Sequence, residues 1–295
     1  MNTLVTGAAG QLGREICRCF GRDGQVVALT RAELDITDRA ALVAAVDAAR
    51  PDVIVNCAAY NDVDGAETDP VTAMRVNSVA VRSLASAAQR TGATLVHYST
   101  DFVFDGQTDR PYDESVEPAP QSVYASSKLI GEWFAAGAPR HYVLRVESLF
   151  GGRAETPGPD GRRLGSTLDR IVDALLDARP VKGFTDRTVS PSYVPDVAVA
   201  TKRLVSQSAP DGLYHCVNEG YATWYDVARV AATRLGCESL VTPIRSDDVV
   251  MIASRPKYCA LSNEKIVAAG ARLSTWQDAL DRYLTARTAA PERSA

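Results

Sequence analysis

The chain has 295 residues, 46% of them hydrophobic and 23% charged, so it can bury a substantial core in one large or two modest domains. Lysine and arginine total 32 against 36 aspartates and glutamates, and the formal charge of −4 excludes a general electrostatic attraction for nucleic acid. The first predicted strand begins without a leader, and no apolar run reaches the roughly 18 residues of a membrane span, so we expect a cytoplasmic protein that does not enter membranes.

Short apolar runs alternate with longer segments of helical period through the first half of the chain. The predicted strands are residues 3–6, 26–29, 53–56, 94–99 and 142–146, and the predicted helices are residues 11–21, 39–49, 70–91 and 124–136. This alternation is typical of a parallel sheet covered by helices. We therefore predict an α/β fold, with a Rossmann-type doubly wound parallel sheet in residues 1–150.

The composition changes after Phe150. Residues 151–165 are rich in glycine, proline and arginine, which predicts a mobile loop of the kind that closes over substrates. Helical patterns return at residues 166–178, 195–207, 223–235 and 275–285, with short apolar segments such as 212–216 between them. We predict a smaller mixed α/β substrate domain in residues 151–285, segments near 184–216 that return to the first sheet, and a flexible tail at 286–295.

The six cysteines, at positions 17, 19, 57, 216, 237 and 259, contain no CxxC spacing, and the three histidines do not cluster with them. A zinc site would be indicated by closely spaced cysteines or by histidines near them, and a disulfide framework by regularly spaced cysteines. We therefore predict neither disulfides nor a bound metal.

A glycine-rich segment, GAAGQLG, directly follows the first predicted strand and opens the first predicted helix. Gly7, Gly10 and Gly13 therefore stand where backbone amides and the positive end of a helix can receive a pyrophosphate. Glycines at this spacing also suit a plain strand-to-helix turn, and it is their position in the fold that favours dinucleotide binding. The spacing GxxGxxG, in place of GxGxxG, points to a cofactor loop of the short-chain type.

The end of the second predicted strand bears on the choice of cofactor. An NAD-selective site would place a carboxylate there for the ribose 2′-hydroxyl, whereas this chain has Arg31, which suits a 2′-phosphate. Glu33 or Asp35 can still reach the ribose, and Arg31 can also be an ordinary solvated side chain. We predict NADPH as the cofactor, with NADH as the alternative. Asp35 and Ile36 are predicted beside the adenine, and the small residues after the third predicted strand are predicted along the cofactor edge: Cys57, Ala58 and Ala59.

Tyr124 and Lys128 lie four residues apart in a predicted helix, so both side chains leave the same face one turn apart. An ammonium beside a phenol favours the phenolate, so we expect Lys128 to lower the pKa of Tyr124 and make it a better general acid. Thr100 ends the fourth predicted strand, where the carboxyl ends of parallel strands open onto the ligand crevice. Its hydroxyl can bond the oxygen that Tyr124 protonates. We therefore predict Thr100, Tyr124 and Lys128 as a catalytic group, although each also has an ordinary structural interpretation.

The stretches GAAGQLG, STDFVFDG and YASSK together resemble an extended short-chain dehydrogenase/reductase. More narrowly, the chain is similar to the dTDP-4-dehydrorhamnose reductase family from residue 2 to about 284. The resemblance implies NAD(P)H-dependent reduction of the C4 keto group of a nucleotide-linked 6-deoxyhexose, with Thr100, Tyr124 and Lys128 as the catalytic triad. It also assigns five cofactor contacts: Gly7, Gly10, Gln11, Leu12 and Ala58.

The chain departs from this family pattern at the end of the fifth predicted strand. Members commonly have a small hydroxyl residue followed by tryptophan there, whereas this chain has Glu147 and Ser148. We expect a broader sugar pocket at Ser148 in consequence. By their positions, Asp101 and Val103 are candidate substrate contacts and Arg255 is a candidate phosphate partner, and each can equally be a surface or packing residue.

Three other functions come into question, of which the epimerase and the regulatory subunit remain as alternatives. Sister dehydratases place a glutamate where this chain has Phe102, which cannot transfer the required proton. A nucleotide-sugar epimerase would need the same cofactor and tyrosine. A non-catalytic regulatory subunit resembling that of methionine adenosyltransferase would bind the dinucleotide alone. For the reductase we expect a nucleotide-linked keto-sugar as the partner molecule and either a monomer or a homodimer.

Overall fold

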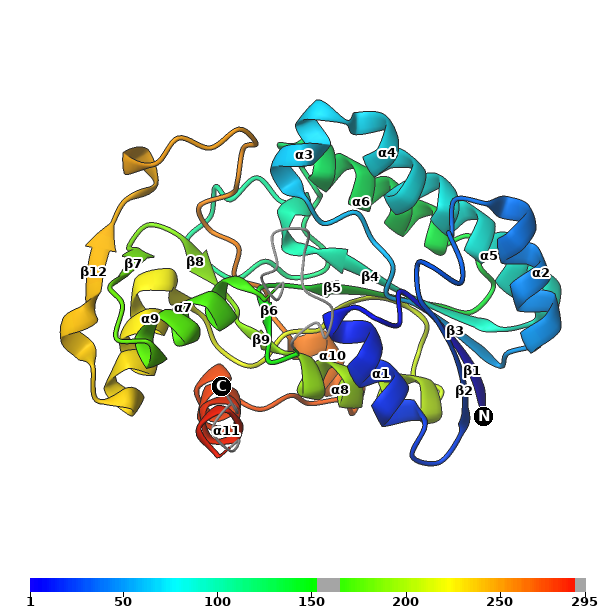
Figure 1. Cartoon of the computed structure of the whole chain (residues 1–295). Coiled ribbons are helices and arrows are strands. Elements are labelled where there is room, and N and C mark those ends of the chain that lie inside the picture. Colours follow the sequence, from blue (N-terminus) through cyan, green and yellow to red (C-terminus); the bar gives the residue numbers. More distant parts are fainter. Residues whose placement is uncertain (153–164, 290–295) are drawn as a thin grey trace.

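The computed structural model describes residues 1–152 and 165–289, which form two adjoining units (Figure 1). The larger unit is built on a parallel sheet of six strands in the order β10-β5-β4-β3-β1-β2. The strands are β1 (Asn2–Thr6), β2 (Gln25–Leu29), β3 (Val53–Asn56), β4 (Thr94–Thr100), β5 (His141–Val146) and β10 (Gly212–His215). The doubly wound parallel sheet predicted from the sequence is confirmed, and the five predicted strands lie within one residue of their predicted ends.

Helices cover both faces of this sheet (Figure 1). One face carries α2 (Arg39–Ala49), α3 (Val63–Thr68), α4 (Pro70–Met74), α5 (Ala80–Thr91) and α6 (Val123–Ala135), and the other carries α1 (Gln11–Phe20), α8 (Val194–Ser206) and α10 (Glu264–Ala268). The strand order turns back between β1 and β3, and in such sheets ligands bind at the carboxyl ends beside this reversal. The reversal therefore places a crevice directly after Thr6 and Asn56.

The predicted helix 70–91 is present but not uniform. Between α4 and α5 the chain makes a five-residue π-helix, η1 (Arg75–Val79). Such turns are rare and often lie at functional sites. Here the π-helix carries Asn77, which is buried.

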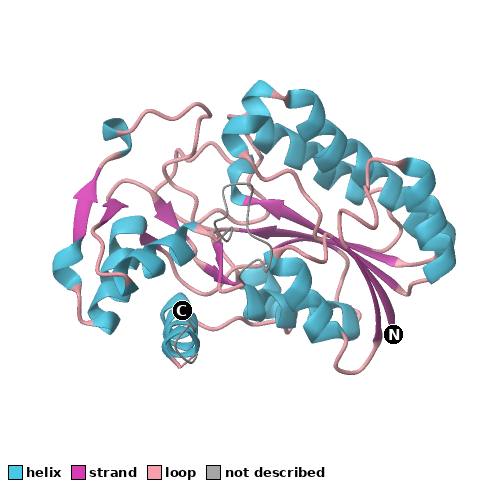
Figure 2. Cartoon of the chain, viewed as in Figure 1, coloured by secondary structure: helices cyan, strands magenta, loops and turns pink. Residues whose placement is uncertain are grey.

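The smaller unit packs three helices against short strand pairs (Figure 2). The helices are α7 (Thr167–Leu176), α9 (Trp224–Leu235) and α11 (Trp276–Thr288). The pairs are β7 (Val181–Phe184) with β12 (Val241–Ile244), β8 (Thr188–Val189) with β11 (Ala222–Thr223), and β6 (Leu149–Phe150) with β9 (Ser192–Tyr193). Three short 3-10 turns complete the fold: η2 (Asp101–Val103), η3 (Glu238–Leu240) and η4 (Ser246–Asp248).

Two predictions concern segments at the limits of the described residues. The predicted mobile loop 151–165 falls almost wholly on residues 153–164, outside the described part of the chain. The predicted tail begins too early, because 286–288 complete α11, where Arg287 bonds Asp173 at 2.6 Å and Tyr283 at 2.8 Å. Within the two described ranges, no helix has the length and apolar character needed to cross a membrane.

Candidate active site

The glycine-rich segment forms a tight turn between β1 and α1. Gly7 has a φ of +67°, and a Cβ atom there would lie 2.6 Å from the Ala58 backbone nitrogen. A Cβ atom at Gly13 would lie 2.3 Å from the Gly7 carbonyl oxygen. Gly10 is the N-cap of α1 and offers no side chain to its first amides, whereas Asp38 caps α2 and Ser122 caps α6. The turn thus keeps a helix N-terminus open for an anion and fits a dinucleotide pyrophosphate.

A cavity of about 480 Å³ continues from this turn past the end of β2. Arg31, Asp35 and Ile36 line it, as do the predicted residues Cys57, Ala58 and Ala59. Hydrogen bonds from the Thr37 amide (2.9 Å) and hydroxyl (2.8 Å) lower the pKa of Asp35, and the charges of Arg31 and Arg75 add to this. Arg75 also lines the cavity and was missed, because a helical arginine far along the chain carries no motif.

Glu33 turns away from this cavity. Its carboxylate accepts hydrogen bonds from the Thr30 amide and hydroxyl, both at 2.8 Å, and it does not line the cavity wall. Of the two acidic residues considered as partners of the ribose, only Asp35 lines this cavity, and Arg31 and Arg75 line it as well. The end of the cavity next to β2 therefore carries more positive than negative charge.

Thr100, Tyr124 and Lys128 line a second cavity, of about 470 Å³, next to the glycine turn. It also contains Gln11 and Leu12. The Lys128 ammonium donates to the Tyr98 carbonyl oxygen at 2.5 Å, which ties α6 to β4. Thr100, at the end of β4, lines this cavity beside Tyr124. The structure therefore brings together three side chains predicted from separate motifs.

The electrostatics of the three residues differ from our expectation. Burial and the nearby Asp101 carboxyl raise the pKa of Tyr124, and the Thr100 hydroxyl beside it only partly opposes this. Burial also lowers the pKa of Lys128 to about 8, against the charges of Glu132 and Cys57. The predicted lowering of the Tyr124 pKa by Lys128 is wrong for this structure, because both groups are desolvated. Tyr124 therefore retains its proton at neutral pH, as a proton donor must.

Asn77 of the π-helix links two segments of the site by buried hydrogen bonds. Its amide accepts from the Tyr60 backbone nitrogen at 2.9 Å and donates to the Tyr60 carbonyl at 3.0 Å and to the Ser127 hydroxyl at 2.9 Å. Ser127 in turn donates to the Tyr124 carbonyl at 2.7 Å. One buried side chain thus connects the segment after β3 to the helix that carries Tyr124 and Lys128.

A third cavity, of about 680 Å³, opens from Thr100 and Tyr124 toward the smaller unit. Asp101, Ser148 and Arg255, three of the candidate substrate contacts, line this cavity, and Arg255 pairs with Asp64 of α3 at 2.8 and 2.9 Å. Val103 does not reach it: the η2 turn directs this side chain into a hydrophobic cluster with Phe104, where it is fully buried. Three cationic residues that sequence reasoning missed also line the cavity: Arg170, Lys182 and Arg187.

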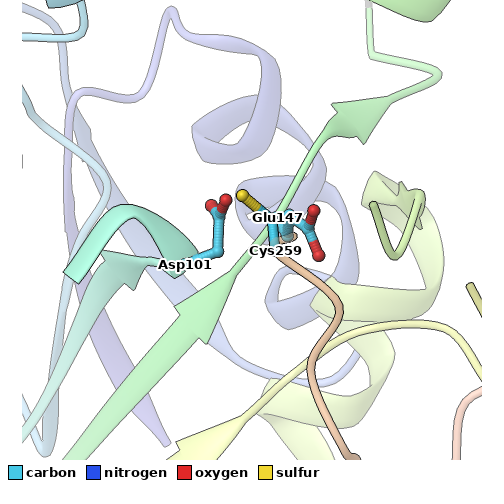
Figure 3. A group of neighbouring side chains, drawn as sticks. All are labelled: Asp101, Glu147 and Cys259. Carbon is cyan, nitrogen blue, oxygen red and sulfur yellow. The ribbon is translucent and has the colours of Figure 1, made fainter. Parts of the chain in front are cut away.

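Three buried ionisable side chains lie together, and we call Asp101, Glu147 and Cys259 the acid cluster (Figure 3). They come from η2, from the end of β5 and from the segment after η4, and their oxygen and sulfur atoms lie within 4.8 Å of one another. Burial raises the pKa of Asp101 to about 6, and burial together with the Asp101 charge raises the pKa of Glu147 well above its usual range. The Cys259 pKa is also raised by burial. The cluster therefore favours bound protons over the deprotonated atoms that a metal ion needs.

Known proteins share this architecture over nearly the whole chain. The family model described as the RmlD substrate binding domain matches residues 1–289. The dTDP-4-dehydrorhamnose reductase of Mycobacterium tuberculosis is 38% identical over 96% of this chain and 92% of its own. The dTDP-4-keto-6-deoxy-D-glucose reductase of Streptomyces niveus is 36% identical over 90% of each chain.

Solved structures agree with these sequence matches. The dTDP-4-dehydrorhamnose reductase of Bacillus anthracis, crystallised in complex with NADP, superposes with a TM-score of 0.88 at 28% identity, covering 96% of this chain and 98% of its own. The chain therefore belongs to the RmlD family of extended short-chain dehydrogenases/reductases, the family of the dTDP-4-dehydrorhamnose reductases.

Proposed function

We propose that the protein is an NADPH-dependent reductase of the C4 keto group of a dTDP-linked 4-keto-6-deoxyhexose. The observation that carries the proposal is that two cavities meet at Thr100 and Tyr124. One begins at the glycine turn. The other is the cavity of about 680 Å³ with cationic side chains on its wall, which we call the substrate cavity. A carbonyl carbon placed there would face a cofactor on one side and a proton donor on the other. Relatives named as reductases of dTDP-linked sugars support the choice of substrate.

The cofactor region fits a bound dinucleotide phosphate. The uncapped α1 terminus and the glycine turn would hold the pyrophosphate, and Arg31 with Arg75 would hold a 2′-phosphate. When bound, the reduced nicotinamide supplies the hydride. NADH lacks the 2′-phosphate that the arginines would bind and is the alternative cofactor. The NADP complex of the Bacillus anthracis relative supports this preference.

Three side chains divide the remaining chemistry. Tyr124 gives its proton to the carbonyl oxygen as negative charge develops there, and its raised pKa keeps that proton in place until it is needed. Thr100 stabilises the same oxygen by a hydrogen bond. Lys128, held against the Tyr98 carbonyl one helical turn from Tyr124, adds a positive charge on the same face of α6, which favours the tyrosinate as it forms.

The substrate cavity favours an anionic handle remote from the reacting carbon. Arg170, Lys182, Arg187 and Arg255 bring four positive charges to its wall, which suit a diphosphate. Binding energy from that diphosphate would orient the sugar, so a free keto-sugar should react far more slowly. Ser148 leaves room around the ring for a substituted or epimeric hexose.

The proposal extends to the setting of the reaction. We place the protein in the cytoplasm, as a monomer or homodimer, with a nucleotide-linked keto-sugar and not a nucleic acid as its partner molecule. The formal charge of −4 supports the exclusion of nucleic acid, and six unpaired cysteines suit a reducing compartment.

The test is the oxidation of NADPH with a panel of carbonyl compounds. We expect rapid turnover of dTDP-4-keto-rhamnose or a related dTDP-linked 4-keto sugar, and a kcat/KM lower by orders of magnitude for the free sugar. Brisk reduction of small ketones without turnover of any nucleotide-linked sugar would contradict the substrate class. Dinucleotide binding without any turnover, together with co-purification of a synthetase, would favour a regulatory subunit.

A further inference from the structure

The acid cluster has no part in the mechanism described so far, although it contacts the proposed active site. Asp101 is 4% exposed, Glu147 2% and Cys259 3%. Glu147 Oε2 accepts a hydrogen bond from the Ser190 backbone nitrogen at 2.7 Å, whereas its Oε1 is buried and has no hydrogen-bond partner among the residues that the structure describes. The ion pairs formed by the described residues include neither carboxyl group.

Two carboxyl groups in this setting cannot both be ionised at neutral pH. Burial penalises each charge, and the second charge would lie within 4.8 Å of the first. Such a pair titrates as a unit and keeps one proton between its members over a wide pH range. The proton can reside on Asp101 or on Glu147, and the pair then carries a single negative charge.

The position of this proton decides what the Thr100 hydroxyl can do. In the structure Thr100 Oγ1 donates to Asp101 Oδ1 at 3.0 Å. A hydroxyl has only one proton to donate, so in this arrangement Thr100 cannot also donate to a carbonyl oxygen of the substrate. When Asp101 is protonated, its own O–H can donate to Thr100 Oγ1, and the Thr100 proton becomes free for the substrate.

We infer that Glu147 is a positioning residue for the proposed reduction: it keeps a proton available to Asp101, which frees the Thr100 hydroxyl to bond the reacting oxygen. The inference rests on the proposed function. Negative charge develops on the substrate oxygen beside Thr100, and Asp101 is the carboxyl bonded to Thr100. The proton therefore leaves the Glu147 O–H and binds Asp101, while the charge of the pair stays at minus one.

Other titratable groups around the pair do not change ionisation in the same pH range. From α6, Tyr124 faces Asp101, and its pKa is raised by burial. Tyr258 and Cys259 face Glu147 from the segment after η4, and burial raises the pKa of both. The Arg187 guanidinium, between β7 and β8, interacts with Cys259 and stays charged. Lys128 has a pKa of about 8, so its ionisation changes only toward the upper limit of the tested range, and it is present in every variant considered.

The test measures kcat with a confirmed dTDP-linked keto-sugar between about pH 5 and 8. Glu147→Gln removes the shared proton, and the new side-chain carbonyl can still accept the Ser190 hydrogen bond. Asp101→Asn replaces the switching group by an amide that can always donate to Thr100. Glu114→Gln is the matched control, because Glu114 is a half-buried carboxyl with a pKa raised by burial that accepts from the His215 nitrogen on the far side of α6.

We expect the wild type to keep its kcat well above pH 6. Glu147→Gln should match it near pH 5.5 and then lose about tenfold per pH unit, toward a floor about 10²-fold lower or less, because one hydrogen bond to the oxygen is lost. KM should change little. Asp101→Asn should show no such decline, and adding Glu147→Gln to it should change nothing further. Glu114→Gln should follow the wild type.

Three results would overturn the inference. Glu147→Gln could keep the wild-type profile, could lower kcat by one factor at every pH, or could have the same effect with and without Asp101→Asn. If Asp101→Asn does not fold, the pH profile of Glu147→Gln against its control decides alone. Absence of turnover in the wild type at every pH would refute the proposed function itself, which is a distinguishable outcome.

Discussion

Gly7→Ala tests whether the close approach of the turn after β1 to the segment after β3 forms the cofactor site. The alanine would adopt a φ of +67°, which costs about 1–2 kcal/mol for a residue with a Cβ atom. The new Cβ would also lie 2.6 Å from the Ala58 nitrogen and 2.8 Å from the Cys57 carbonyl carbon. Both are backbone atoms, so the turn and the segment after β3 must separate. We expect the Kd for NADPH to rise at least tenfold, or about 1.4 kcal/mol.

Gly92→Ala is the matched control for this experiment. Gly92 has a φ of +73°, but a Cβ atom there would meet nothing within 4 Å. We expect this variant to lose about 1–2 kcal/mol of unfolding free energy and to bind NADPH normally. Calorimetric titration and chemical denaturation of both variants separate the two effects. Normal NADPH affinity in a folded Gly7→Ala protein would refute the assignment of the glycine turn.

The remaining predictions concern four side chains of the site. Tyr124→Phe removes the proton donor and should lower kcat by about 10² to 10⁴ while NADPH binding, followed by fluorescence, is kept; wild-type turnover would remove Tyr124 from the mechanism. Arg31→Ala should lower the ratio of kcat/KM for NADPH to kcat/KM for NADH, and an unchanged ratio would mean that other residues bind the 2′-phosphate. Asn77→Ala leaves the Tyr60 backbone groups without their buried partner and should lower the free energy of unfolding by about 2–4 kcal/mol in chemical denaturation. An unchanged free energy of unfolding would show that other contacts hold that segment. Lys128→Met should abolish most activity yet stabilise the apo protein at pH 7. The folded-state pKa of about 8 lies below the unfolded value, so the lysine costs stability below pH 8, and the gain should fade as the pH rises toward about 10.4. A Lys128→Met protein less stable than the wild type at pH 7 would contradict this.

Much of the larger unit could be predicted because its signals are local. Each strand from β1 to β5 is a short apolar run between turn residues, and Asp38 marks the start of α2 with a side chain that caps the Ala40 and Ala41 amides. The glycine turn and the Tyr124–Lys128 pair are read from spacing alone. Placing them at strand ends was enough to predict that they share a crevice.

The cavity residues that were predicted wrongly or not predicted depend on how the chain folds in three dimensions. Val103 is two residues from Asp101, but the η2 turn places it in the core, and no spacing reveals that rotation. Arg170, Lys182 and Arg187 reach the substrate cavity from α7 and the short strands of the smaller unit. Their register follows from packing of that unit and not from a motif in the sequence.

The electrostatic errors have a different cause. A Tyr-x-x-x-Lys spacing places two groups on one helix face but gives neither their burial nor their other neighbours. Burial and Asp101 outweigh the expected effect of Lys128 on the Tyr124 pKa. The acid cluster likewise joins residues from three distant segments. The departure at Glu147 was visible in the sequence, but its partners were not.

The central claim is that a hydride passes from the reduced cofactor to C4 of a nucleotide-linked keto-sugar at Thr100 and Tyr124. The most direct measurement uses NADPH carrying deuterium at the transferred position of the nicotinamide and a dTDP-linked 4-keto-6-deoxyhexose, with the product examined by nuclear magnetic resonance. We predict a single deuterium at C4 of the hexose, with the dTDP group intact and the rate strongly reduced in Tyr124→Phe. A product without deuterium at C4, or an unchanged sugar beside a cofactor that stays reduced, would contradict the account.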